Sequence, residues 1–164
     1  MTIFIKNKYT LQIDEFKFRC CIGKKGSTKH KKEGDKKTPI GTFEIENIYF
    51  RKDRKIKPLT LLKCVEIKNN MGWCDDTRFP KKYNKLIKIE KKIKNEKLKR
   101  KDSKYDFLIP IKYNFKKPVT GLGSCIFIHL TKDYKPTAGC IALKEKDFLI
   151  MVKLIKKNSK IKIF

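Results

Sequence analysis

Short apolar runs with alternating polar residues, separated by turn residues, dominate the chain. β-branched and aromatic residues are frequent in these runs, as in strands that bury one face of a sheet. The runs are TIFIK (2–6), YTLQI (9–13), FRCCI (18–22), GTFEIENIYF (41–50), LLKCVEIK (61–68), YDFLIPIKYN (105–114), CIFIHL (125–130) and KIKIF (160–164). The pattern predicts a mostly β protein with short helices, of the β-rich α+β class.

Two segments, 85–100 and 144–157, place their apolar residues at helical spacing. Such spacing predicts an amphipathic helix, and in 85–100 its outer face is strongly basic. The apolar positions are Leu86, Ile89 and Ile93 in the first segment and Phe148, Leu149, Val152 and Ile155 in the second. We therefore expect these two helices beside the sheets.

The remaining stretches are typical of loops. Residues 23–41 combine glycines and a proline with many lysines, and residues 69–84 carry the only tryptophan among turn-forming residues. Neither an internal repeat nor a Pro-rich or Ser-rich linker interrupts the chain. Since 164 residues suit one domain of ordinary size, we expect a single domain over 1–164, and a monomer.

The formal net charge of +26 raises the question of a nucleic-acid partner. Of the 43 basic residues only five are arginines, and the lysines are spread through every segment. Specific reading of phosphates and bases relies on the bidentate guanidinium group. The pattern therefore favours solvated surface lysines and no specific nucleic acid, with loose attraction to anionic polymers at low salt.

The six cysteines do not indicate a metal site or a disulfide scaffold. No two have Cys-x-x-Cys spacing, and the chain has only two histidines, so the ligands of a structural zinc site are lacking. We expect no metal and no cofactor. No apolar run reaches the roughly 20 residues of a membrane span, and the N-terminal segment has no signal-peptide core.

One stretch, HLTKDYKPTAGC (129–140), concentrates the candidate chemistry. His129 ends a predicted strand, and Cys140 follows the small residues Thr137, Ala138 and Gly139. An imidazole can take the proton of a thiol, which then becomes a nucleophile. In a tight turn the amides of residues 138–140 can converge on one point, as an oxyanion hole requires. The alternative is a buried structural thiol and a histidine satisfied within its strand.

Four motifs in the same order resemble the YkuD-type L,D-transpeptidases. IFIHL followed by PTAGCIAL is similar to the family's strand-borne His and its Ser/Thr-x-Gly-Cys signature. GKKG and GDKKTPIGTFEI resemble its N-terminal Gly-x-x-Gly and Asp-x-x-Thr-Pro-x-Gly-x-Phe block, which is largely structural. GWCDD, YN (83–84), RKDSKYD and GSCIFIH resemble a short subgroup of the family. Together the motifs span roughly residues 20–148.

The resemblance implies a YkuD-type sandwich in which His129 activates the nucleophile Cys140. It also implies site residues at the oxyanion or the substrate, for some of which a scaffold role is the alternative. These are Thr137, Ala138, Gly139, Tyr83, Asn84 and Arg100. Many members have His at the position of Ala138. Several have Ser where Leu130 follows the histidine, so we expect a backbone carbonyl to orient the imidazole here.

The implied activity is cysteine-dependent L,D-transpeptidation of peptidoglycan stem peptides or muropeptides. A thioester acyl-enzyme would form with release of a terminal D-amino acid, and an amine would resolve it into a cross-link. The alternatives are an L,D-carboxypeptidase on the same substrates and a non-catalytic basic module that binds nucleic acid or anionic wall polymer. A catalytic thiolate would be alkylated faster than the other cysteines. Location stays open between the cytoplasm and the periplasm or cell wall.

Overall fold

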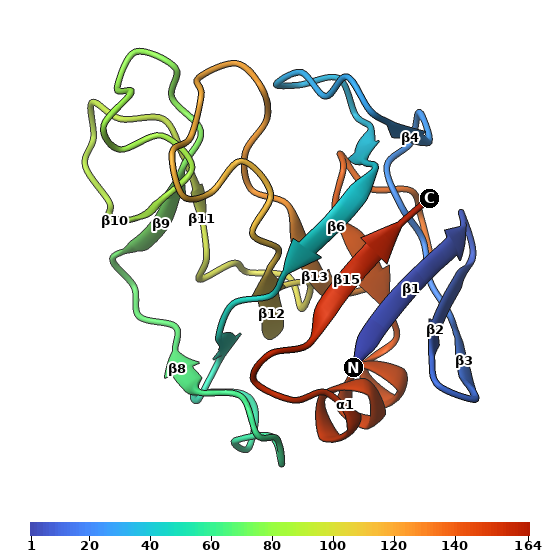
Figure 1. The fold of residues 1–164 in the computed structure, drawn as a ribbon. Coiled ribbons are helices and arrows are strands. Elements are labelled where there is room, and N and C mark those ends of the chain that lie inside the picture. The colour runs from blue at the N-terminus through green and yellow to red at the C-terminus, as the bar shows by residue number, and fades with distance from the viewer.

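The computed structural model describes residues 1–164, which form fifteen strands and one helix. Ten of the strands belong to two five-stranded sheets, and the others form a three-stranded sheet and a two-stranded pair. Figure 1 shows the helix, α1 (Glu145–Leu154), at one side of the sheets. At ten residues, this helix is too short to cross a bilayer. The mostly β class predicted from the sequence is confirmed, although only one of the two expected helices forms.

The first five-stranded sheet joins the two ends of the chain. Its strand order is β3-β2-β1-β15-β6, and β1 and β15 are its only parallel neighbours. Its members are β1 (Thr2–Asn7), β2 (Thr10–Ile13), β3 (Phe16–Arg19), β6 (Gly41–Glu44) and β15 (Lys160–Ile163). In Figure 1 the first strand and the last lie side by side at the centre of this sheet. The predicted strand at the C-terminus is thus confirmed.

The second five-stranded sheet carries the segments with candidate chemistry. Its order is β14-β13-β12-β7-β8, with parallel pairs at both edges, β13 with β14 and β7 with β8. Its members are β7 (Ile48–Phe50), β8 (Cys64–Glu66), β12 (Phe107–Pro110), β13 (Phe127–Leu130) and β14 (Ile141–Leu143). The parallel pair of β13 and β14 decides the geometry of the site, because it sets residues 127–130 beside residues 141–143.

The main hydrophobic core lies between the two large sheets and α1. Alternate residues of β1, β2 and β15 meet alternate residues of β7, β12 and β13, as expected of strands that each bury one face. The helix contributes Phe148, Met151 and Val152, all fully buried. Ile128 and Leu130 of β13 point into this core. The predicted helix over 144–157 is confirmed, with bounds a few residues shorter.

A second core lies on the opposite face of the second sheet. There Phe127 of β13 packs with Tyr49, Trp73 and Tyr105, and Cys140 belongs to the same cluster. The ring of Trp73 meets the ring of Phe127 edge to face at 5.4 Å, a favourable aromatic arrangement. The two faces of the CIFIHL segment therefore divide as its alternation predicts. Its Ile126, Ile128 and Leu130 side joins the main core and its Phe127 side joins this second core.

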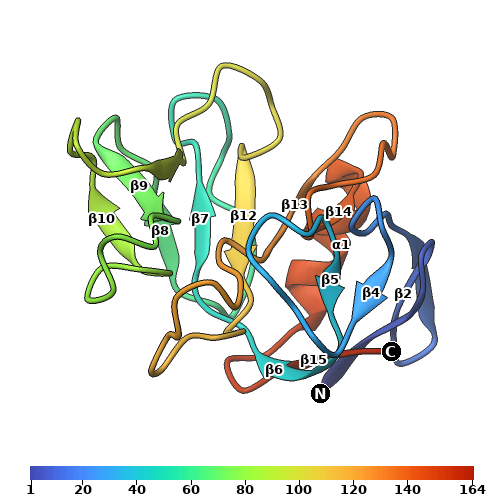
Figure 2. The same cartoon turned by 90° about the horizontal axis from the view of Figure 1, so that it is seen from above.

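A three-stranded antiparallel sheet, in the order β10-β9-β11, covers the second core. Its strands are β9 (Met71–Cys74), β10 (Leu86–Lys88) and β11 (Asn95–Lys97). Viewed from above, β9 and β10 lie beyond β7, on the side away from β2 (Figure 2). The helix predicted over 85–100 is therefore wrong, and so is the prediction of an uninterrupted loop over 69–84.

The failure of the helix prediction has a physical cause. The sequence LIKIE (86–90) also alternates with the period of a strand, so the pattern by itself is ambiguous. Both β10 and β11 pair with β9, and this arrangement buries Ile93 and Leu98 almost completely. An isolated lysine-rich helix would bury only the apolar side chains along one side of it. The long-range strand partner therefore outweighs local helical spacing.

The glycine-rich loop 23–41 runs along the outside of the molecule and returns toward β14. It contains the short parallel pair β4 (Ser27–Thr28) and β5 (Thr38–Pro39). Thr38 is completely buried: its hydroxyl donates to the carbonyl of Gly139 at 2.9 Å and accepts from the amide of Gly23 at 2.9 Å. Through Thr38 the loop therefore supports the turn that precedes β14.

Candidate active site

His129 and Cys140 are brought to one face by the parallel pair of β13 and β14. His129 is the register partner of Ala142, and Cys140 precedes Ala142 by two residues. Because side chains two apart in an extended segment share a face, Cys140 and His129 point to the same side of the sheet. Both line one cavity of about 440 Å³. The turn of residues 136–139 delivers the thiol to the edge of this cavity.

The imidazole of His129 is held by a backbone carbonyl. Its Nδ1 lies 2.8 Å from the carbonyl oxygen of Leu130, which confirms the predicted kind of orienting group. Since a carbonyl only accepts, Nδ1 carries the proton and Nε2 has a free lone pair. Tyr105 packs edge to face against the ring, with centroids 5.3 Å apart. The side chain is thus fixed as the tautomer that a general base requires.

Burial keeps this imidazole neutral. Desolvation, with smaller contributions from the nearby cations Lys104 and Arg100, lowers the pKa of His129 from 6.5 to about 4, while the hydrogen bond to the Leu130 carbonyl opposes the shift. The residue is 6% exposed. At neutral pH it is therefore an uncharged acceptor, ready to take a proton.

The thiol of Cys140 is also neutral in the resting protein. Its Sγ donates to the carbonyl of Cys125 at 3.1 Å and accepts from the amide of Phe127 at 3.4 Å. Burial raises its pKa to about 12, against a smaller lowering by the Phe127 amide. A preformed thiolate, and with it the expected rapid alkylation of Cys140, is therefore not supported. No hydrogen bond joins this thiol to the imidazole of His129, and the two side chains share only the cavity that both line.

Two backbone amides next to the thiol have no acceptor in the protein. The amides of Ala138 and Cys140 make no hydrogen bond, whereas the amide of Gly139 donates to the hydroxyl of Thr137 at 3.1 Å. That hydroxyl in turn donates to the carbonyl of Cys140 at 2.6 Å. Thr137 therefore braces the turn, and two of the three expected amides are left to stabilise an oxyanion.

Gly139 is needed for a close approach at this turn. Its φ is +143°, and a Cβ at this position would lie 2.9 Å from the carbonyl oxygen of Lys37. Only glycine has no side chain to meet that oxygen. The supporting loop and the turn of the thiol can therefore pack backbone to backbone, with Thr38 bridging them.

Cys140 lies where two hollows meet, and the hollows differ in charge. The larger, of about 440 Å³, contains His129, the cations Arg100, Lys104 and Lys135 and the carboxylates Glu96 and Asp133; we call it the basic arm. The smaller, of about 220 Å³, contains three carboxylates and is called the acidic arm. Its carboxylates are Glu33, Asp75 and Glu96, and the lysines Lys31 and Lys36 also line it. Ala138, Cys140, Glu96 and Tyr105 line both arms.

Arg100 lies in the wall of the basic arm, and its charge is already matched. Its guanidinium contacts Glu96 at 2.8 Å and Asp102 at 2.7 Å, and it stacks over Tyr105 at 5.0 Å from the ring centre. Lys104 forms no ion pair in the structure and is exposed. Of the cations near His129, Lys104 is therefore the freest to bind an anionic group.

Tyr83 and Asn84 lie in the scaffold behind the cleft and line neither arm. The hydroxyl of buried Tyr83 donates to Glu33. The Asn84 side-chain oxygen accepts from the indole of Trp73 at 2.9 Å and from the amide of Cys125 at 3.1 Å. Both side chains thus hold the segment before β13 in place. This arrangement matches the scaffold alternative that the sequence leaves open for them.

The sequence did not single out Tyr105, Lys104 or Glu96 as site residues. Tyr105 touches the imidazole and lines both arms, and Glu96 lies between the arms. Lys104 and Tyr105 fall in RKDSKYD, so the motif gives a signal, but only the fold shows which of its side chains reach the cleft. Glu96 lies in the segment mistaken for a helix, and no local pattern marks it.

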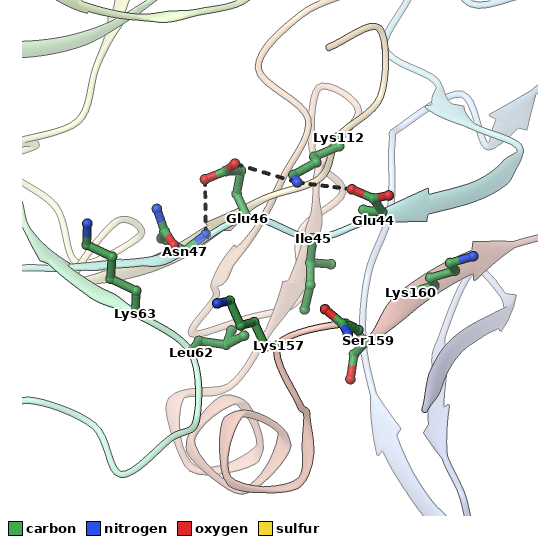
Figure 3. A pocket seen from close by; sticks show the side chains of 11 residues that line it. Glu44, Ile45, Glu46, Asn47, Leu62, Lys63, Lys112, Lys157, Ser159 and Lys160 are labelled. Atoms are coloured by element: carbon green, nitrogen blue, oxygen red, sulfur yellow. Dashed lines mark hydrogen bonds and ion pairs between the residues drawn. The ribbon is translucent and has the colours of Figure 1, made fainter. Parts of the chain in front are cut away.

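A further hollow of about 310 Å³ lies away from this cleft, between β6 and the segment before β15 (Figure 3). Lys112 bridges Glu44 and Glu46 there, at 3.0 and 3.8 Å. No cysteine or histidine lines it, so it offers no nucleophile or base comparable with Cys140 and His129. No group of three or more His, Cys, Asp or Glu side chains in the structure is arranged to hold a metal ion.

Comparison with known protein families gives one match. The family described as the L,D-transpeptidase catalytic domain, YkuD, matches residues 2–163. No curated protein and no solved structure matches the chain. The match covers both large sheets, the helix and the cleft that contains Cys140 and His129.

Proposed function

Because the chain belongs to the YkuD family of L,D-transpeptidase catalytic domains, we propose that it is a cysteine acyltransferase that cross-links peptidoglycan stem peptides. One observation carries the proposal: neutral His129 and the thiol of Cys140 share a face of the sheet, beside two amides without acceptors. These are the parts that acyl transfer needs, a nucleophile, a base and an oxyanion site.

The first half-reaction makes a thioester. The sulfur of Cys140 attacks the carbonyl carbon on the L-centre of the diamino acid in a donor stem, while the thiol proton passes to Nε2 of His129. The amides of Ala138 and Cys140 donate to the resulting oxyanion, each contributing about 3 kcal/mol in comparable sites. Collapse of the tetrahedral intermediate breaks the amide bond, and the imidazolium returns its proton to the amine of the departing D-amino acid.

The second half-reaction consumes the thioester. The amine of an acceptor stem attacks the thioester carbonyl and gives a proton to His129, and collapse releases the sulfur of Cys140, which regains the proton. If water attacks instead, the product is a shortened stem with a free carboxylate, and the enzyme acts as an L,D-carboxypeptidase. One site supports both outcomes, because only the nucleophile of the second step differs.

The charges of the two arms suit the two substrates. The D-amino acid that leaves the donor carries a carboxylate, which fits beside the unpaired Lys104 in the basic arm. The acceptor brings an amine, which fits the acidic arm. There the buried Oδ1 of Asp75 has no hydrogen-bond partner, while its Oδ2 pairs with Lys94 at 2.9 Å. We therefore place the donor in the basic arm and the acceptor in the acidic arm.

The test is product analysis with a purified disaccharide tetrapeptide as both donor and acceptor. A cross-linked dimer is the expected product, together with free D-amino acid, and Cys140→Ala should form neither. Cys64→Ala is the matched control and should retain activity, because Cys64 lies in β8 away from the cleft. A shortened monomer alone would identify the carboxypeptidase. No product with the wild-type chain would favour a non-catalytic basic module.

A further inference from the structure

The loop between β7 and β8, residues 51–63, exposes three large aliphatic side chains. Ile56 is 91% exposed, Leu59 is 75% exposed and Leu61 is 70% exposed. Single exposed aliphatic residues are ordinary on protein surfaces, whereas several together mark contact surfaces. Three of them fall within six consecutive residues here. Since the chain buries most of its other aliphatic side chains in two cores, the clustering of three exposed ones needs a physical account.

The loop is braced from both ends. At its start the guanidinium of Arg51 donates to the carbonyl of Arg100 at 2.6 Å, and Arg54 donates to the carbonyls of Lys101 and Asp102, each at 3.0 Å. These bonds tie the loop to the wall of the basic arm. The start of the loop is thus held in one position.

Two further contacts hold the loop near α1. Lys55 forms an ion pair with Glu145 in the first turn of the helix at 2.6 Å. Leu62 is buried in the main core. The aliphatic tips lie between these two anchors, so they are held outward and cannot turn into the core without breaking one of the contacts. In Figure 1 the segment leading to β8 projects at the end of the molecule where α1 lies.

Cations without ion-pair partners lie in this loop and on the helix beside it. Lys57 and Lys63 belong to the loop, and Lys153 of α1 faces it across a groove of about 440 Å³ whose other walls include Leu59 and Leu149. None of these three lysines forms an ion pair. The surface therefore presents aliphatic groups at its tip and unpaired positive charge at its base. Such a distribution suits a partner that is apolar inside and anionic at its surface.

We propose that the β7–β8 loop docks the protein on an anionic lipid bilayer. Ile56, Leu59 and Leu61 enter the boundary between headgroups and acyl chains, and the lysines lie among the phosphates. The net charge of +26 adds long-range attraction to such a surface. A polysaccharide or nucleic acid would satisfy the lysines but has no apolar phase to take up the three aliphatic tips. The proposal is independent of the acyl-transfer chemistry.

Vesicle binding tests the proposal. The full chain is mixed with vesicles of phosphatidylglycerol and phosphatidylcholine, or of phosphatidylcholine alone, and the bound fraction is measured by sedimentation. Binding is expected only to the anionic vesicles. The variant Ile56→Ser/Leu59→Ser/Leu61→Ser should bind at least about ten-fold more weakly, because it loses the apolar insertion. The control Tyr9→Ser/Val119→Ser/Leu122→Ser removes three exposed apolar side chains elsewhere and should bind like the wild type.

A fluorescent reporter tests insertion directly. Ile56→Trp places an indole at the tip, against a constant background from Trp73, which is buried. On anionic vesicles its emission should shift to the blue and be quenched by brominated acyl chains. Equal binding of the triple serine variant and the wild type, or an indole that stays in water on the vesicle, would overturn the proposal. So would binding to a soluble anionic wall polymer without binding to vesicles. Circular dichroism confirms that each variant is folded.

Discussion

Protonation of His129 should make the protein lose stability in mild acid by a predictable amount. Burial lowers the pKa of this imidazole from 6.5 to about 4 in the folded protein. Between these two values the unfolded chain binds a proton that the native protein does not, so the free energy of unfolding falls as the pH falls from above 6.5 toward 4. Proton linkage over this interval amounts to about 2–3 kcal/mol between about pH 7.5 and about pH 4.5.

The assay is urea unfolding of the wild type and His129→Gln at the two pH values. Carboxylates and the high net charge also change stability in acid, but they do so equally in both proteins. The wild type should therefore lose about 2–3 kcal/mol more than His129→Gln. His30→Gln, at an exposed loop position, is the control and should lose as much as the wild type. If the wild type and His129→Gln lost the same free energy of unfolding, the conclusion that the imidazole is buried and neutral would be refuted.

The same pKa has a kinetic consequence. A general base acts in its neutral form, so kcat/KM should rise with pH along a limb centred near the pKa of about 4 for His129. An imidazole of ordinary pKa would place that limb more than two pH units higher. Agreement between the kinetic limb and the unfolding measurement would assign both to one side chain.

Three other predictions follow from the contacts at the cleft. Thr38→Val should lower the free energy of urea unfolding by about 2–4 kcal/mol, because a buried amide and a buried carbonyl lose their hydrogen-bond partner. The control Thr42→Val, at an exposed site, should leave the free energy of unfolding nearly unchanged. Equal losses of stability in the two variants would contradict this role of Thr38. Asp75→Asn should raise the KM for the acceptor stem and leave the rate of thioester hydrolysis unchanged. If the rate of hydrolysis also fell, the substitution would have disturbed the structure of the site. Iodoacetamide should label Cys140 no faster than Cys64 at neutral pH, since burial raises the pKa of Cys140 to about 12. Mass analysis of the peptides measures the two rates. Selective labelling of Cys140 would indicate a preformed thiolate.

The local spacing of apolar residues predicted the structure correctly where one face of an element is buried and the other is not. The alternation of CIFIHL gave the division of β13 between two cores, and the spacing within 144–157 gave α1. It failed at 85–100, where helical spacing and strand alternation coexist. There the partner strand β9 made the choice, and no property of the segment itself reveals that partner.

The sequence by itself determined the β-rich class, the family, and the two residues with the chemistry of a base and a nucleophile, His129 and Cys140. These features depend on the types of the residues and on their order along the chain. Only the tertiary structure decided the charges of the two arms, the free amides of Ala138 and Cys140, and the scaffold positions of Tyr83 and Asn84. It also decided that the pair is neutral, because a pKa depends on how much of a group is removed from water, and burial is set by segments far apart in the chain.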